Sequence, residues 1–249
     1  MKSSNKRTMA AATAGAISIG LGLSLLASQA IASPYVIHDN YIGEDPTDSS
    51  YDGKDIIGDA SLFEISKMEV SFTSPNMMAV DVYSRYFNNI GMYETQLGDL
   101  FVSTDGYGGD GEDWEYVLQL DDYSGDTSAG ALKLYEVVEG NINYSFADTG
   151  YIFREGQEVQ YNGSGPDSLA AGSWDLFNTE EGSDEDDYLR FAIAYDFGDV
   201  SEFGFHWTMT CGNDVIEGGA PAPVPEPATA LLFGAGLAGL AGVVRRKKK

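Results

Sequence analysis

Apolar and polar residues alternate along several short stretches of this chain. In WEYVLQLD at 114–121, every second residue from Trp114 onward is aromatic or aliphatic. FGFHWTMTC at 203–211 alternates in the same way from Phe203 to Cys211, with Gly, His and Thr between the apolar residues. A period of two predicts strands that bury one face.

Seven further stretches are candidate strands: LFEISKMEVSF (62–72), MAVDVYSRYF (78–87), DLFVS (99–103), ALKLYEVV (131–138), YIFRE (151–155), EVQYN (158–162) and YLRFAIAYDF (188–197). Gly-rich and Asp-rich turn sequences separate them, and no long segment keeps a helical period. We therefore expect residues 33–219 to form an all-β ectodomain, an antiparallel β-sandwich of the jelly-roll-like kind.

Both ends of the chain depart from this pattern. Residues 1–32 have a basic opening, an apolar stretch and the triplet Ala30-Ile31-Ala32. These features predict a secretory signal peptide that is cleaved before Ser33. Export would then involve the general secretory translocon and signal peptidase.

The C-terminal end contains three consecutive segments of different character. Residues 220–227 form a Pro-rich linker, and alternating prolines favour an extended backbone. Residues 228–244 carry no charge, and as a helix with about 1.5 Å per residue they would be about 26 Å long, just enough to cross a bilayer. Basic residues flanking a span stay on the cytoplasmic side. The cytoplasmic stop consists of Arg245, Arg246, Lys247, Lys248 and Lys249.

The order Val224-Pro225-Glu226-Pro227, apolar run and basic cluster resembles the PEP-CTERM sorting signal of Gram-negative bacteria. The resemblance covers about a tenth of the chain. It implies recognition by exosortase, a membrane cysteine transpeptidase that acts near the Pro-Glu-Pro motif. The protein would then be anchored transiently in the inner membrane, with the ectodomain outside, before it reaches the cell surface or extracellular matrix. A plain single-pass anchor would explain the apolar run and the bases but not the Pro-Glu-Pro motif.

Setting the two ends aside makes the charge of the chain more extreme. Residues 33–220 contain six basic residues against 38 acidic ones, a formal charge of −32. Such a field repels nucleic acid and anionic polymers and attracts divalent cations and basic partners. Nucleic-acid binding is therefore excluded.

The chain offers few residues for catalysis. Cys211 is the only cysteine, and His38 and His206 are the only histidines. On a strand, His206 and Cys211 would project to opposite faces, so they cannot act together as base and nucleophile. We expect Cys211 to be buried and inert and His206 to lie on a solvated face, and we predict no catalytic residues.

Calcium is the cofactor that the composition favours, because it takes hard oxygen ligands from flexible loops. The sequences DGYGGDGED and DEDD supply such oxygens, although neither has the spacing of the twelve-residue calcium loop. The alternative is a set of solvated loops without an ion. The candidate ligands are Asp105, Asp110, Glu112, Asp113, Asp184, Asp186 and Asp187.

The sequence thus predicts a non-enzymatic surface or extracellular-matrix protein that acts in adhesion or in association with exopolysaccharide and biofilm. The alternative is a surface-displayed carbohydrate-binding module or weak glycoside hydrolase, which would need aromatic side chains outside the core. Tyr83 and Phe87 are the candidate pair for that role.

Overall fold

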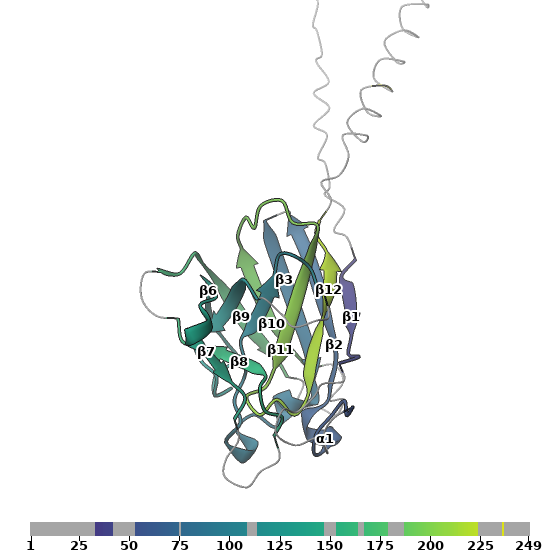
Figure 1. Cartoon of the computed structure of the whole chain (residues 1–249), viewed down its shortest axis with the longest axis vertical. Coiled ribbons are helices and arrows are strands. Elements are labelled where there is room, and N and C mark those ends of the chain that lie inside the picture. The colour runs from purple at the N-terminus through teal and green to yellow at the C-terminus, as the bar shows by residue number, and fades with distance from the viewer. Residues whose placement is uncertain are drawn as a thin grey trace, which may run out of the picture. The chain divides into compact units, whose positions relative to one another are not determined.

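The computed structural model describes residues 33–41, 53–74, 76–108, 114–146, 153–163, 167–178, 187–223 and Gly236 (Figure 1). The twelve strands described there are β1 (Tyr35–His38), β2 (Ile65–Ser74), β3 (Met77–Ser84), β4 (Leu100–Ser103), β5 (Tyr116–Leu120), β6 (Ala129–Glu136), β7 (Ile142–Tyr144), β8 (Glu158–Tyr161), β9 (Ala170–Phe177), β10 (Tyr188–Ala194), β11 (Glu202–Thr208) and β12 (Val215–Pro221). The short helices are α1 (Ala60–Phe63), η1 (Arg85–Asn88), η2 (Met92–Glu94) and η3 (Glu139–Asn141).

Ten of these strands form one sheet in the order β1-β2-β3-β10-β9-β6-β5-β4-β11-β12, and every neighbouring pair is antiparallel. The two outermost strands, β1 and β12, contact each other, so the sheet folds back on itself. The all-β antiparallel class is therefore confirmed. A jelly roll has two separate sheets, and among the described strands the structure has instead a single folded sheet and a small ribbon.

The folded sheet encloses the main hydrophobic core. The β11 alternation is confirmed on this side, because every apolar residue from Phe203 to Cys211 belongs to this core. Trp207 is completely buried and donates its indole N–H to the Gly98 carbonyl at 3.1 Å. Burying such side chains stabilises the fold at about 25 cal/mol for each Å² of apolar surface removed from water.

The remaining two strands, β7 and β8, form an antiparallel ribbon, whose residues pack on the other face of the sheet. A second, smaller hydrophobic cluster holds it there, made of Phe101, Trp114, Val117, Tyr135 and Tyr161. Because this ribbon covers part of the outer face, strands there are buried on both sides. A pattern of period two does not reveal burial of this kind.

Two expectations from the alternation are wrong. The prediction that His206 is solvated is wrong, since its ring is fully buried. Trp114 was expected on the same face as Leu118, but it packs with Val117 in the second cluster. Strand β5 begins only at Tyr116, so the alternation does not extend back to Trp114.

Some strands are absent from the sequence prediction, and the described part of one predicted strand has another structure. Residues 153–155 of the predicted strand YIFRE have no strand structure, and Arg154 is completely buried there. Strand β9 was not predicted because Ala, Gly and Ser dominate its first half. Its Gly172 lies so close to β10 that a Cβ would sit 2.1 Å from the Ala192 carbonyl oxygen.

The processing segments fall largely outside the described residues. This holds for the predicted signal peptide up to Ala32, for Val224, Pro225, Glu226 and Pro227, and for the basic stop at 245–249. The predicted span at 228–244 also lies outside them, apart from Gly236, and no helix among the described residues is long and apolar enough to cross a membrane. Strand β12 continues to Pro221, so ordered pairing extends into the Pro-rich linker.

Candidate functional site

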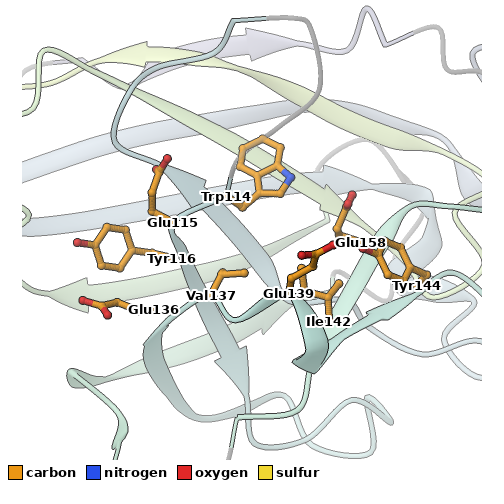
Figure 2. A pocket seen from close by; sticks show the side chains of 9 residues that line it. All are labelled: Trp114, Glu115, Tyr116, Glu136, Val137, Glu139, Ile142, Tyr144 and Glu158. Atoms are coloured by element: carbon orange, nitrogen blue, oxygen red, sulfur yellow. The ribbon is translucent and has the colours of Figure 1, made fainter.

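A pocket of about 580 Å³ opens where the β7–β8 ribbon meets the sheet (Figure 2). Its walls come from the start of β5, the end of β6, η3 and both ribbon strands. We call it the aromatic–glutamate pocket, since its lining combines three aromatic residues with four glutamates. The lining residues are Trp114, Glu115, Tyr116, Glu136, Val137, Glu139, Ile142, Tyr144 and Glu158.

Tyr161 of β8 fixes one wall of this pocket. Its hydroxyl donates to the Glu136 carbonyl at 3.0 Å and accepts from the Val138 N–H at 3.2 Å. These bonds hold the segment after β6, whose side chains line the pocket. The tyrosine ring itself lies in the second cluster, so the ribbon and this wall are anchored together.

A buried ion pair supports the pocket from behind. His206 donates through Nδ1 to Glu217 at 2.7 Å and through Nε2 to the Glu158 carbonyl at 2.7 Å. Burial by itself lowers the pKa of His206, but the hydrogen bond and charge of Glu217 outweigh it and raise the pKa. The imidazole ring of His206 also packs against the indole ring of Trp114, with the ring centroids 5.6 Å apart. The pair thus fixes Trp114 and the backbone of Glu158, which both line the pocket.

The indole of Trp114 forms the inner wall, and its side chain is only 6% exposed. Its Nε1 is buried and has no hydrogen-bond partner in the part of the chain that the structure describes. Figure 2 shows the nitrogen on the edge of the ring that faces Glu158. A buried donor without a partner costs free energy unless a ligand or water accepts from it.

The pocket has two similar ends, which Figure 2 shows on either side of Val137. At one end Tyr116 lies near Glu115 and Glu136, and at the other Tyr144 lies near Glu139 and Glu158. Burial, and then the charges of Glu158 and Glu139, raise the pKa of Tyr144. Burial, then Tyr195, and then the charges of Glu136 and Glu115 raise the pKa of Tyr116. Both phenols therefore stay neutral and can donate hydrogen bonds to a ligand.

A different set of carboxylates, Asp39, Asp55 and Asp214, lies close together outside the pocket. One oxygen from each falls within 4.8 Å of the others, so among the described residues this is the group that could hold a metal ion. Burial, and then the charge of Asp39, raise the pKa of Asp214 well above its usual range. Arg154 lies beside the cluster and donates to the Asp55 carbonyl at 2.7 Å. The protein thus supplies part of the balancing charge itself.

The structure describes only two of the candidate calcium ligands, Asp105 and Asp187. Asp105 is exposed after β4, whereas Asp187 is buried before β10 and accepts from Asn88 at 2.6 Å. Neither belongs to a group of three metal-ligating side chains among the described residues. The candidates outside the described residues are Asp110, Glu112, Asp113, Asp184 and Asp186. Calcium binding at these loops stays a prediction.

The structure also places the cysteine and the aromatic pair that the sequence singled out. Cys211 is buried, as expected, and burial raises the pKa of its thiol to about 12. Phe87 is 3% exposed in the main core, so Tyr83 and Phe87 do not form an exposed aromatic pair. Tyr83 instead packs against Tyr188, with centroids 5.0 Å apart.

Sequence reasoning did not find the aromatic–glutamate pocket. Its residues come from three stretches of the chain, at 114–116, 136–144 and 158, which only the fold brings together. The one available signal was the short sequence EVVEGNINY at 136–144, where glutamates and aromatic or aliphatic residues surround a turn.

Comparison with known proteins concerns the C-terminal segment. Residues 223–247 match the family model of the PEP-CTERM protein-sorting motif. The resemblance found in the sequence is confirmed, and the motif implies processing by an exosortase, a membrane protein. It supports an exported protein that an exosortase sorts. No curated protein and no solved structure shows significant similarity to the chain.

Proposed function

We propose that this chain is an exosortase-sorted surface or extracellular-matrix protein whose ectodomain binds polysaccharide without cleaving it. Adhesion and biofilm association would follow from that binding. The sorting motif supports delivery to the cell exterior, and the aromatic–glutamate pocket supplies the binding site. This proposal joins the predicted matrix role to the alternative of a carbohydrate-binding module.

The combination of side chains in the pocket carries the proposal. Binding pockets for small ligands typically measure about 300–1,000 Å³ and pair apolar walls with a few polar groups, and this pocket has about 580 Å³. The exposed ring of Tyr144 offers an apolar face that suits the face of a pyranose ring, and Trp114 forms the apolar inner wall. Carboxylates accept hydrogen bonds from sugar hydroxyls, and the indole N–H and phenols donate them.

Binding is tested with the exported protein purified from its producing cell and passed over immobilised exopolysaccharide of that cell. Replacing Tyr144 by alanine should weaken retention, because it removes a ring that is 46% exposed at the pocket mouth. Tyr35→Ala is the matched control, since Tyr35 is 47% exposed and lies outside this pocket. Unretained wild-type protein, or equal loss in both variants, would contradict polysaccharide binding at the pocket.

Glycoside hydrolysis is the second candidate, because hydrolases use two carboxylates that flank a sugar and this pocket has four. Incubating the purified protein with the same polysaccharide should release no new reducing ends. Release that disappears in a Glu158→Gln variant would identify a hydrolase and refute the non-enzymatic role.

A further inference from the structure

The charge in the aromatic–glutamate pocket is negative at both ends. Glu115 and Glu136 lie at one end and Glu139 and Glu158 at the other, and none of the described residues that line the pocket is a lysine, arginine or histidine. The surrounding region 33–220 carries a formal charge of −32. A polysaccharide rich in carboxylate or sulfate groups would be repelled from such a site.

Three of the four glutamates are available to a ligand. Within the part of the chain that the structure describes, the carboxylates of Glu136, Glu139 and Glu158 make no hydrogen bond or ion pair. Only Glu115 is engaged, since it accepts from the Thr104 N–H at 2.7 Å. A cationic group would therefore meet Glu136 at one end and Glu139 at the other, and neither carboxylate has a hydrogen-bond or ion-pair partner among the described residues. The charge of Glu158 also acts on His206.

The spacing of these carboxylates does not suit a single metal ion. Among the described residues, only Asp39, Asp55 and Asp214 bring three candidate ligand atoms within 4.8 Å of one another. The pocket glutamates are therefore more widely spread than the ligands of one bound ion. Separated negative groups suit an extended ligand with positive charges at intervals.

The same ligand should accept a hydrogen bond from the indole N–H of Trp114. Its Nε1 is buried, has no hydrogen-bond partner among the described residues and favours a ligand with an acceptor oxygen. The aromatic side chains of the pocket attract cationic groups and also pack against the apolar face of a sugar ring. An amino sugar provides hydroxyl and ring oxygens, an apolar ring face and, where it is not acetylated, an ammonium group.

We propose that the aromatic–glutamate pocket binds a polysaccharide with free amino groups, namely a partly deacetylated amino-sugar polymer. This inference rests on the proposed function and narrows it to one class of polysaccharide. Successive amino sugars would place ammonium groups near the glutamates at both ends, with a sugar ring against Trp114.

Titration calorimetry with the exported protein purified from its producing cell tests the inference. The probes are a glucosamine oligomer, its fully N-acetylated form, a neutral glucose oligomer and an oligolysine peptide. We expect the glucosamine oligomer to bind about tenfold more tightly than the acetylated form, because acetylation removes several partly exposed ion pairs. The affinity should also fall as salt is added.

The variant Glu136→Gln/Glu158→Gln should lose most of that preference for the free amine. Glu202→Gln is the control, because Glu202 is exposed on β11 and does not line the pocket. Thermal melting of each variant confirms that it is folded. If the double variant is folded and keeps the full preference, the inference is overturned.

The remaining outcomes separate the inference from the proposed function. Equal binding of the acetylated or glucose oligomer would overturn the requirement for amino groups and leave polysaccharide binding intact. Binding of oligolysine alone would show a site for basic protein segments and overturn both. Binding of none of the four probes would likewise count against both.

Discussion

His206 and Glu217 face each other across β11 and β12 as a buried ion pair, with Nδ1 and Oε1 2.7 Å apart. The second ring nitrogen donates to the Glu158 carbonyl of β8. Both nitrogens therefore have oxygen partners, an arrangement that favours the doubly protonated, charged imidazole. One side chain thus joins two strands of the sheet to the ribbon that bears the pocket.

Removing one partner of this pair should destabilise the protein strongly. His206→Gln or Glu217→Gln alone leaves an uncompensated buried group, so we expect each to lower the free energy of unfolding by about 3–5 kcal/mol. The double variant should recover part of that loss. Chemical denaturation of the four proteins measures the coupling, and strictly additive losses would show that the pair does not act as a unit.

The effect of pH on this pair has a defined sign. The folded pKa of His206 is raised above its ordinary value of 6.5, so the folded protein holds the proton more tightly than the unfolded chain. The pair's contribution is complete below about pH 6.5 and is lost as pH rises through the raised pKa. The gap in stability between wild type and His206→Gln should therefore narrow with rising pH.

Asp99 should make the protein more stable under mildly acidic conditions. Burial raises the pKa of this carboxyl to about 8, although it accepts hydrogen bonds from the Leu120 and Tyr161 N–H groups. The folded state then binds its proton more tightly than the unfolded state, so stability falls as pH rises between about 4 and about 8. Burial is also the main cause that raises the pKa of Asp39 and of Asp214. These two carboxyls should therefore also make the protein less stable as pH rises.

The variant Asp99→Asn isolates this contribution. Its free energy of unfolding should decline less between pH 5 and pH 8 than that of wild type. Asp126→Asn is the control, because Asp126 is exposed and should leave the decline unchanged. Equal declines in the Asp99→Asn variant and wild type would mean that Asp99 is charged in the folded protein over the whole range.

Strand β9 should not tolerate a side chain at Gly172. A Cβ there would lie 2.1 Å from the Ala192 carbonyl oxygen of β10, which is backbone and cannot rotate away. We expect Gly172→Ala to lower the free energy of unfolding by about 1–3 kcal/mol. At Gly108 a Cβ would meet no described atom within 4 Å, so Gly108→Ala should leave the stability almost unchanged. Thermal melting of both variants measures the difference. Equal melting temperatures for the two variants would refute the close approach of β9 and β10.

Part of the fold could be predicted from periodicity because one sheet face is uniformly apolar. The alternation from Phe203 to Cys211 correctly identified the core side of β11. The same pattern was wrong about His206, because polarity was interpreted as exposure and the ribbon that buries the opposite face lies elsewhere in the chain. Alternation therefore identifies one buried face and does not detect a second layer.

Strands without large side chains could not be predicted from the sequence, and neither could sites made of segments that are far apart in it. Strand β9 has few apolar side chains at its start, and β12 contains Gly218 where Ile37 packs closely. The aromatic–glutamate pocket depends on the pairing of β7 with β8 and on its docking against Trp114. Local patterns contain no information about either contact. The sorting motif, by contrast, is contiguous, and it was found from the sequence and confirmed by the family model.

The central claim, export followed by exosortase processing, is tested most directly by the intact mass of the protein recovered from its producing cell. We expect a product that begins at Ser33 and ends near Pro227, without the apolar segment and the basic stop. A Pro225→Ala/Glu226→Ala variant should accumulate with the uncut C-terminus. Wild-type protein that retains Lys249, or a double variant whose mass matches processing near residue 227, would contradict this account.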